Sequence, residues 1–466
     1  MAKAKPRLIV VSNRGPYQSV RSGRKRIRVR TIGGLVSALD PVLSARGGVW
    51  VSGDDKRAER LEDSNGTRLR YQLATARLSR GDRDGFYLGV SNALLWPILH
   101  SMPPTVRIGQ LSWPAYEKAN RVFCDAVLRA SHKDDLIWIH DFHLMLLPAL
   151  VRARRPRARV GWFCHIPWPG FDLFEILPWR AQILEGLLGA DVIGFHTEGY
   201  AQNFLRCVET LLPGTAVDFK GRTIRLHGRR VRVVVAPIGI PLDEIQRVAA
   251  DPSVSAEVER IRRWVDNRRI ILGVDRLDYT KGIPQRLLAF EQLLRSDRNA
   301  RHRYLLVQIM VPSRTDVRAY AELKTDIDRL VGDINGRYAS AGRIPIQYFY
   351  RNMAPAELYA HYRAADVALI TPLRDGMNLV ALEFVACRIH GGGALVLSEF
   401  AGAARYLDGA IVVNPYDVNA VAEALRRAIG MKPREARARM ESLRAEVARM
   451  DVHKWADGFL AHLERR

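Results

Sequence analysis

The chain has 466 residues, and its 72 Lys and Arg against 49 Asp and Glu give a formal net charge of +23 at pH 7. Because 48% of the residues are hydrophobic, the chain can bury a large core, which excludes wholesale disorder. Its apolar stretches fall far short of the roughly 20 residues that a membrane span needs. The length predicts two or three domains in a soluble protein.

The cysteines and the amino terminus bear on the compartment. Cys124, Cys164, Cys207 and Cys387 lie far apart and form no C-x-x-C pair, which indicates neither a disulfide framework nor a zinc site. The basic segment Met1–Arg7 is followed by only a short apolar run, too short for a secretory signal. We expect reduced thiols, a cytoplasmic location and no membrane association.

Short β-branched runs alternate with longer amphipathic segments along the whole chain, which is typical of βαβ units on parallel sheets. The predicted strands are Leu8–Val11, Val49–Val51, Leu136–Ile139, Val160–Cys164, Val192–Phe195, Val231–Ala236, Ile270–Val274, Tyr304–Ile309, Ile346–Tyr350, Val367–Ile370, Ala394–Leu397 and Ile411–Val413. Helical spacing of apolar residues predicts helices over Trp113–Arg129 and Ile176–Leu188. The sequence therefore predicts an α/β fold with two Rossmann-like, doubly wound domains.

The segment Pro237–Pro241 predicts the boundary between these domains, because two prolines and a glycine directly after a strand stop regular structure. We expect an N-terminal domain of residues 1–243 and a C-terminal domain of residues 244–466 that ends in a helix. Ligands of open α/β sheets bind at the carboxyl ends of the strands. Two such domains facing each other predict a site for two substrates in the cleft between them.

The segment Gly273–Gly282 (GVDRLDYTKG) places Arg276 and Lys281 in a loop beyond a predicted strand. Two cations at a strand end can hold a pyrophosphate, with the arginine fork on two oxygens and the lysine as a point charge. The simpler alternative is a surface ion pair of Arg276 with Asp278 or Asp275.

The segment Thr371–Glu383 (TPLRDGMNLVALE) also follows a predicted strand. We expect a tight turn at Asp375-Gly376 and a helix beginning near Asn378. The helix amino end offers N–H groups to a phosphate, and Glu383 further along can accept hydrogen bonds from ribose hydroxyls. The alternative is an ordinary turn with Glu383 on the surface.

The first half places His140, Asp141, His143 and His165 just past strand ends, in the segments IWIHDFH and WFCHIPWP. A metal site of His140, Asp141 and His143 is one interpretation, although this spacing is not a standard ligand pattern. Hydrogen bonding to a polyol is the better use of these residues. The pair Gly33-Gly34 would let the backbone approach a ligand closely.

Several motifs are absent from the sequence. It has no G-x-x-x-x-G-K-[ST] loop, no G-x-G-x-x-G after a strand and no G-x-S-x-G elbow, which disfavours ATP hydrolysis, nicotinamide chemistry and serine hydrolysis. The basic run Arg21–Arg30 contains no aromatic residue for base stacking, so we expect a solvated loop and no nucleic-acid partner. Phosphorylated, polyhydroxylated ligands fit the remaining residues.

In an ordered set of motifs that spans nearly its whole length, the chain resembles the trehalose-6-phosphate synthase family, glycosyltransferase family 20. The motifs are SNRGP (Ser12–Pro16), GGLVSAL (Gly33–Leu39), YLGVSNALLWP (Tyr87–Pro97), IHDFHL (Ile139–Leu144), HIPWP (His165–Pro169), DRLDYTKG (Asp275–Gly282), SRTDVRAY (Ser313–Tyr320) and RDGMNLVALE (Arg374–Glu383). SEFAGAARYL (Ser398–Leu407) and VNPYD (Val413–Asp417) follow them.

The resemblance implies the two-domain GT-B fold and transfer of glucose from UDP-glucose to glucose 6-phosphate. The products would be UDP and α,α-trehalose 6-phosphate, formed with retention of configuration and without a metal or another cofactor. It implies no nucleic-acid or membrane partner, and leaves open whether the enzyme is a homo-oligomer.

The family pattern also implies roles for single residues. Arg276 and Lys281 would neutralise the departing diphosphate, helped by the backbone at Asn378, Leu379 and Val380. The other donor-side assignments are Glu383 on the ribose, Asp375 on the hydroxyls of the donor sugar, Gly34 closing on the donor and His165 against the transferred glucose. The acceptor positions are Arg14, Tyr87, Asp141 and Arg314.

The chain departs from the family pattern after Trp50. The family usually shows a second tryptophan there, in a W-x-G-W stretch that helps to wall the acceptor pocket, whereas this chain continues VSGDD. Because this tryptophan lies at the acceptor pocket, its absence bears on which acceptor the enzyme uses. Glucosylglycerol-phosphate synthases, which resemble the same family closely and use glycerol 3-phosphate, are therefore the alternative enzyme. A non-catalytic sugar-phosphate sensor on this fold is the alternative from another class.

Overall fold

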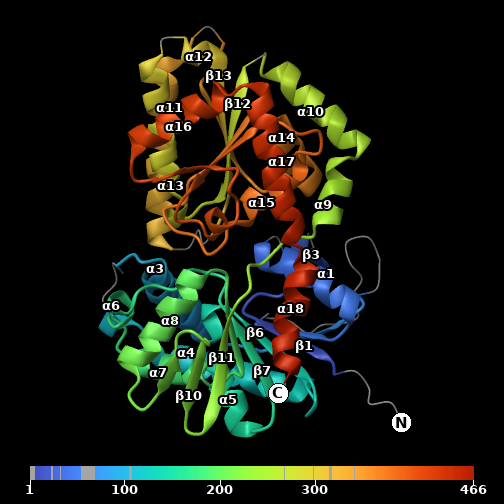
Figure 1. Cartoon of the computed structure of the whole chain (residues 1–466), viewed down its shortest axis with the longest axis vertical. Coiled ribbons are helices and arrows are strands. Elements are labelled where there is room, and N and C mark those ends of the chain that lie inside the picture. The colour runs from blue at the N-terminus through green and yellow to red at the C-terminus, as the bar shows by residue number, and fades with distance from the viewer. Residues whose placement is uncertain are drawn as a thin grey trace. The chain divides into compact units, whose positions relative to one another are not determined.

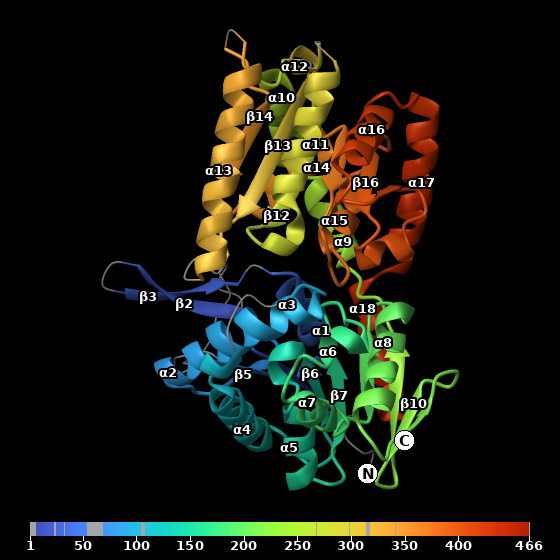
Figure 2. The ribbon, with the colours of Figure 1, turned by 90° about the vertical axis from the view of Figure 1, so that its left-hand side faces the viewer.

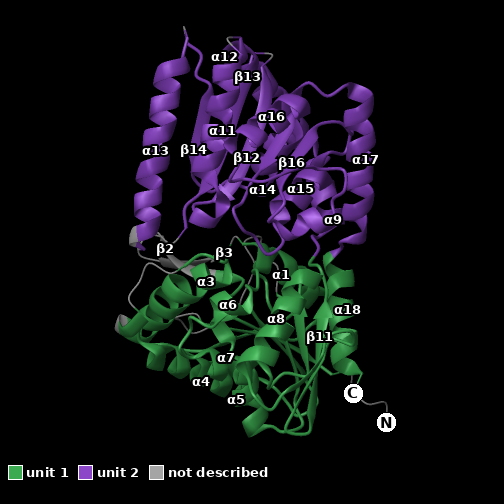
Figure 3. Ribbon diagram, turned by 60° about the vertical axis from the view of Figure 1, so that its left-hand side comes forward, with its two compact units in different colours: residues 1–238, 452–466 green, residues 239–451 purple. Residues whose placement is uncertain are grey.

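The computed structural model describes residues 6–22, 25–31, 33–53, 69–103, 108–266, 268–297, 299–313, 317–340 and 342–465. The chain divides into two compact units, shown in Figure 3. Unit 1 comprises residues 1–238 and 452–466, and unit 2 comprises residues 239–451. The division falls inside the segment Pro237–Pro241, whereas the C-terminal helix, expected in the second domain, belongs to unit 1.

In the part of unit 1 that the structure describes, nine strands form one sheet in the order β5-β4-β1-β6-β7-β8-β11-β10-β9. Figure 1 labels β1, β6, β7, β11 and β10 of this sheet. The strands are β1 (Leu8–Ser12), β4 (Val49–Ser52), β5 (Gln72–Thr75), β6 (Leu136–His140), β7 (Arg159–Phe163), β8 (Val192–Phe195), β9 (Ala216–Asp218), β10 (Thr223–Leu226) and β11 (Arg229–Val235). The pairs from β5 to β11 are parallel, and β10 and β9 add an antiparallel edge. The order in which successive strands are added to the sheet reverses between β1 and β6. Such sheets bind ligands at the carboxyl ends of the strands at this switch point.

Helices of unit 1 cover this sheet. They are α1 (Gly34–Arg46), α2 (Arg80–Arg83), α3 (Trp96–Leu99), α4 (Trp113–Ala130), α5 (Leu147–Arg154), α6 (Phe171–Phe174), α7 (Arg180–Leu187), α8 (Glu198–Leu211) and α18 (Val452–Glu464), with a π-helical segment at Asp84–Leu95 and 3-10 turns at Ile108–Gln110 and Phe142–Leu144. Strands β1, β4, β6 and β8 are buried along their length, with Trp50, Trp138 and Trp162 fully enclosed. This core burial stabilises the strand ends that carry the candidate residues.

The C-terminal helix α18 packs in unit 1 because its aromatic face fits the sheet. It contacts β7, β8 and α1. Phe459 stacks on Trp138 with ring centroids 4.9 Å apart, and Trp455 lies edge-on to Phe163 at 5.1 Å. At Gly161 on β7 a Cβ would lie 2.7 Å from the Phe459 ring, so only glycine lets the ring sit this close.

In the described residues of unit 2, six parallel strands form a sheet in the order β14-β13-β12-β15-β16-β17. They are β12 (Arg269–Arg276), β13 (Tyr304–Val311), β14 (Ile346–Tyr350), β15 (Val367–Ile370), β16 (Ala394–Ser398) and β17 (Ile411–Val413). The strand order reverses between β12 and β15, so their carboxyl ends mark the expected ligand site of this unit.

Nine described helices belong to unit 2, and Figure 2 shows α13 running along β14 and β13. They are α9 (Leu242–Ala249), α10 (Pro252–Trp264), α11 (Ile283–Ser296), α12 (Ala300–Arg303), α13 (Arg318–Tyr338), α14 (Pro355–Ala364), α15 (Leu379–Cys387), α16 (Val418–Ile429) and α17 (Pro433–Arg449), with 3-10 turns at Tyr279–Lys281 and Gly402–Arg405. Helix α16 begins where the Asp417 carboxylate accepts a hydrogen bond from the Ala420 N–H at 2.9 Å.

All twelve predicted strands are present, with ends that shift by at most two residues. The prediction of a solvated loop at Arg21–Arg30 is wrong, because β2 (Tyr17–Ser22) and β3 (Lys25–Arg30) pair as an antiparallel hairpin. The predicted helix over Trp113–Arg129 is α4, and the one over Ile176–Leu188 is shorter, as α7. Among the described residues, no helix is both long and apolar enough to cross a membrane.

Candidate active site

In unit 2 the loops after β12 and β15 bring a lysine, a carboxylate and an amide together. The Lys281 Nζ donates to the Asp375 Oδ2 at 2.6 Å, and the Asn378 Nδ2 donates to the same oxygen at 2.9 Å. Both partners of the ion pair keep some exposure, 12% for Lys281 and 15% for Asp375. The ion pair therefore lies just beyond the carboxyl ends of β12 and β15 and remains accessible from solvent.

Backbone contacts hold the two loops against each other. The Thr280 carbonyl accepts hydrogen bonds from the Leu373 N–H at 2.7 Å and the Arg374 N–H at 3.3 Å. Directly after Lys281, Gly282 adopts φ +63°, and a Cβ there would lie 2.5 Å from the Thr371 carbonyl oxygen. Only glycine meets both demands at low cost, so Gly282 lets the Lys281 loop pack closely against the Thr371 backbone.

Arg276 ends β12 with its side chain 43% exposed. Its Nη2 lies 3.8 Å from the Oδ2 of the fully buried Asp278, too far for a hydrogen bond. Asp278 also accepts hydrogen bonds from the Thr280 N–H at 3.1 Å and the Tyr320 hydroxyl at 3.3 Å. Of the two ion pairs considered from the sequence, the one with Asp278 is present in this loose form, and Asp275 pairs elsewhere.

The partner of Asp275 is Arg286, which the sequence analysis did not single out. Both side chains are buried. The Arg286 guanidinium donates to the Asp275 carboxylate, to the Thr371 Oγ1 at 3.2 Å, to the Gln308 Oε1 at 3.1 Å and, at 3.4 Å, to the Lys281 carbonyl. It thereby joins the ends of β12 and β15 beneath Lys281. Its spacing from Ile283 and Phe290 puts it on the buried face of α11, a signal that could have found it.

Helix α15 begins where it was expected. Asn378 precedes its first residue with φ 74°, and the Asn378 Oδ1 accepts a hydrogen bond from the Ala381 N–H at 3.2 Å. Asparagine tolerates this left-handed conformation better than most residues. The first turn, which contains Leu379 and Val380, carries the N–H groups and the positive dipole end that attract phosphate.

Glu383 lies one turn inside α15 and is partly buried, so the alternative of a surface residue is wrong. The Tyr362 hydroxyl donates to its Oε2 at 3.2 Å. Burial raises the pKa of Glu383 to about 7, against the lowering effect of this hydrogen bond.

The pKa of Glu383 predicts how stability depends on pH. A carboxyl whose pKa is higher in the folded state contributes stability below about pH 4.5 that is lost as the pH rises through about 7. We expect Glu383→Gln to stabilise the protein relative to wild type more at pH 8 than at pH 5, by about 2 kcal/mol. Urea unfolding at both pH values measures this difference.

A control of opposite sign is available in Glu357, whose pKa is lowered by its hydrogen bond with Arg351. Such a group contributes stability above its unfolded pKa, so Glu357→Gln should lose stability relative to wild type as the pH rises. If Glu383→Gln behaved like Glu357→Gln, the raised pKa of Glu383 would be contradicted.

In unit 1 two histidines meet at the ends of neighbouring strands. The His140 Nδ1 and the His165 Nε2 are 2.9 Å apart, and the His165 N–H donates to the Asp141 Oδ1 at 3.3 Å. Asp141 has φ 74° and ψ 171°, a conformation that costs a non-glycine residue about 1–3 kcal/mol and that clusters at functional sites. The strain sets Asp141 apart from an ordinary turn residue.

Arg14 and Tyr87 also come together in unit 1. The Arg14 Nη2 donates to the Tyr87 hydroxyl at 2.5 Å, and the Tyr87 ring stacks on His143 with centroids 5.8 Å apart. The buried Trp50 supports this loop, because its Nε1 donates to the Ser12 Oγ at 2.8 Å and that hydroxyl donates to the Arg14 carbonyl at 2.7 Å. Trp50 therefore has a positioning role.

The metal interpretation of His140, Asp141 and His143 does not fit these contacts. His140 pairs with His165, and His143 stacks on Tyr87. Across the described residues, no group of three or more His, Cys, Asp or Glu is arranged to hold a metal ion.

Two predicted residues remain. Gly34 is the exposed first residue of α1. Arg314 lies outside the residues that the structure describes.

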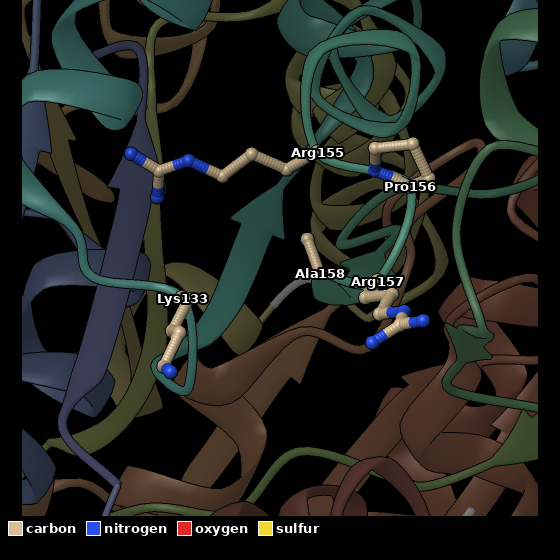
Figure 4. A pocket seen from close by; sticks show the side chains of 5 residues that line it. All are labelled: Lys133, Arg155, Pro156, Arg157 and Ala158. Carbon is tan, nitrogen blue, oxygen red and sulfur yellow. The ribbon is translucent and has the colours of Figure 1, made fainter.

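A basic pocket of about 290 Å³ lies away from the predicted residues, between the start of β7 and the end of α5 (Figure 4). Lys133, Arg155, Pro156, Arg157 and Ala158 line it. Arg155 and Arg157 point in different directions in the figure, and the Arg155 guanidinium donates to the carbonyls of Ser131 and Leu128. This arrangement does not converge on an anion.

Known proteins are similar to this chain along almost its whole length. The family model for glycosyltransferase family 20 matches residues 6–465. The trehalose-6-phosphate synthase of Mycobacterium marinum is 43% identical over 462 residues, which cover 97% of this chain and 92% of that protein.

Solved structures of trehalose-6-phosphate synthases are also similar to this chain. One is described as trehalose-6-phosphate from E. coli bound with UDP-2-fluoro glucose; it is 35% identical, with a TM-score of 0.88 over 99% of both chains. A UDP-forming α,α-trehalose-phosphate synthase from Burkholderia xenovorans, in complex with glucose 6-phosphate, is 34% identical, with a TM-score of 0.89 over 98% of this chain and 100% of that one. The expected GT-B fold of two Rossmann-like domains is confirmed.

Proposed function

Because the chain belongs to glycosyltransferase family 20, we propose that it transfers glucose from UDP-glucose to glucose 6-phosphate, releasing UDP and forming α,α-trehalose 6-phosphate. The observation that carries the proposal is the Lys281–Asp375–Asn378 cluster at the switch point of the unit 2 sheet, with Arg276 at the end of β12, the strand that precedes Lys281. The ligands of the E. coli and Burkholderia structures, a UDP-glucose analogue and glucose 6-phosphate, support both substrates.

On the donor side we assign Arg276 and Lys281 to the diphosphate. The partly exposed Arg276 offers a planar fork and Lys281 a point charge, which suits neighbouring phosphate oxygens. The N–H groups at Asn378, Leu379 and Val380 would add the positive end of α15. These charges stabilise the leaving group most when its negative charge is fully developed.

The sugar-binding assignments use groups that are already positioned. Glu383, fixed by Tyr362, would accept hydrogen bonds from the ribose hydroxyls, and Asp375 from the donor sugar. His165 would contact the transferred glucose, and Gly34 would close on the donor. Arg14 and Tyr87, paired at 2.5 Å, would hold the acceptor with Asp141 and Arg314.

The proposed reaction transfers glucose on one face of the donor sugar. The bond from the anomeric carbon to the phosphate oxygen breaks, the acceptor oxygen bonds to that carbon, and the acceptor proton passes to the leaving phosphate oxygen. A double displacement would need a free carboxylate nucleophile beside the anomeric carbon. Asp375 is poorly suited to this, because Lys281 and Asn378 already donate to its carboxylate.

Incubation of the purified protein with UDP-glucose and one acceptor at a time tests this function. We expect UDP release with glucose 6-phosphate and little with glycerol 3-phosphate or free glucose. Preference for glycerol 3-phosphate would make the protein a glucosylglycerol-phosphate synthase, the alternative raised by the chain after Trp50. Binding of a sugar phosphate with no UDP release under any condition would favour the sensor.

Turnover should survive chelation. The proposal assigns charge neutralisation at the diphosphate to Arg276 and Lys281, the task that a divalent cation performs in other transferases. We expect the same rate of UDP release before and after treatment with excess EDTA. A rate abolished by EDTA and restored by magnesium or manganese would show that these two side chains do not suffice.

We also propose a cytoplasmic location. The four cysteines are free and buried, which suits a reducing compartment.

A further inference from the structure

His140 is a fully buried imidazole that the proposed chemistry does not use. It ends β6, and its Nδ1 lies 2.9 Å from the Nε2 of His165. Its other nitrogen, Nε2, is buried and has no hydrogen-bond partner among the described residues. A buried polar ring that contacts a proposed substrate-binding residue calls for an explanation.

The surroundings of His140 determine which nitrogen carries its proton. The rings of Trp138 and Trp455 have centroids 4.6 Å and 6.4 Å from the His140 ring. Both indole nitrogens are likewise buried without a hydrogen-bond partner in the described part of the chain. An indole N–H can only donate. An unprotonated Nε2 on His140 is an acceptor and so complements the two indole donors. A protonated Nε2 would instead be a third buried donor beside them.

The tautomer of His140 sets that of His165. With its proton on Nδ1, His140 donates to the His165 Nε2, which must then be the accepting nitrogen. The proton of neutral His165 therefore lies on its Nδ1. The main chain of His165 is held as well, since its backbone N–H donates to the Asp141 Oδ1 at 3.3 Å.

We propose that His140 is a positioning residue that holds His165 as a neutral imidazole protonated on Nδ1, so that His165 presents a hydrogen-bond donor to a hydroxyl oxygen of the transferred glucose. The importance of this donor for turnover rests on the proposed function, whereas the tautomer itself does not. Helix α18 contributes to this positioning, because the Trp455 ring lies near both histidines. Its ring centroid is 6.4 Å from that of His140 and 5.9 Å from that of His165.

Electrostatics support the neutral pair. Burial lowers the pKa of His140 to about 3, and burial together with His140 and His196 lowers the pKa of His165 well below its usual range. The titratable groups that face His165 are His140 at the end of β6, Asp141, and His196 after β8. Only Asp141 would favour a charged ring.

The test compares three variants with wild type. His140→Asn keeps an N–H donor close to the position of the imidazole Nδ1, and His140→Leu removes it. His361→Leu is the matched control, because His361 is a largely buried histidine in unit 2 whose Nδ1 lies 2.9 Å from the Glu357 carbonyl. Imidazole ¹⁵N spectra of histidine-labelled protein report each tautomer and its titration, and a His165→Gln sample assigns the His165 signal.

We expect wild type, His140→Asn and His361→Leu to show His165 protonated on Nδ1 and neutral from pH 5 to pH 8. In His140→Leu we expect mixed tautomers and a higher pKa for His165. A wild-type signal with the proton on Nε2 would overturn the proposal, and so would an unchanged His165 in His140→Leu. If His140→Leu does not fold, loss of the Nδ1 tautomer in His140→Asn would overturn it instead.

Kinetics separate positioning from a purely structural role. We expect His140→Leu to lower kcat about 10- to 100-fold, the range seen when a residue that orients a functional histidine is removed, and His140→Asn to restore most of the loss. Binding of UDP, which lacks the glucose, should stay unchanged by calorimetry, whereas general loosening would weaken it as well. If wild type itself released no UDP, the proposed function would fail while the tautomer measurement would still stand.

Discussion

Replacing Lys281 or Arg276 by alanine is expected to lower kcat by about 10²- to 10³-fold, the usual effect of losing one preorganised group that stabilises transition-state charge. Negative charge on the diphosphate grows as the bond to glucose breaks, so each cation acts most strongly in the transition state. The KM for UDP-glucose should change much less. Initial rates of UDP release over a range of both substrates measure this split.

Two features of the structure shape the controls for these variants. Lys281 also pairs with Asp375 at 2.6 Å, so Lys281→Arg tests whether any cation there is enough. Arg351→Gln removes a half-exposed arginine that pairs with Glu357 on the same unit, and should cost at most about 1 kcal/mol of stability with no change in kcat. An unchanged kcat with only a raised KM for UDP-glucose in either alanine variant would contradict the proposed role.

The sequence was sufficient to predict the strands that carry the site. Fully buried parallel strands are near-continuous hydrophobic runs such as Ile270–Val274, so their positions can be predicted without knowledge of tertiary contacts. The hairpin of β2 and β3 was missed because its strong positive charge was interpreted as solvation. The alternation of arginine with Ile27 and Val29 in that segment is a period-two signal that favours a strand.

Residues that act through tertiary contacts were harder to predict. Arg276 and Lys281 were singled out because they lie at and just beyond a strand end, whereas the role of Asp375 came only from the family resemblance. The pairing of Tyr362 with Glu383 depends on the packing of α14 against α15, which no local pattern encodes. The same holds for α18, whose return to unit 1 depends on how Phe459 fits over Gly161.

The second large effect is expected from Arg286, which lies beneath the Lys281 loop. Arg286→Met keeps much of the side-chain volume but leaves the Asp275 carboxylate buried without its cation. Removing one partner of a buried ion pair typically costs about 3–5 kcal/mol of folding stability. We expect a loss of this size in urea unfolding, together with a fall in kcat, because the Thr371 hydroxyl and the Lys281 carbonyl lose a shared donor.

A double variant distinguishes stability from positioning. Burial raises the pKa of Asp275 in spite of Arg286, which indicates that desolvation of the pair is expensive. Asp275→Leu combined with Arg286→Met removes both charges, and such apolar replacements are often neutral for stability. The double variant should therefore regain much of the lost stability while kcat stays low, since the ends of β12 and β15 are still not joined through the guanidinium. If kcat recovered in step with stability, Arg286 would contribute to folding alone and would not position Lys281.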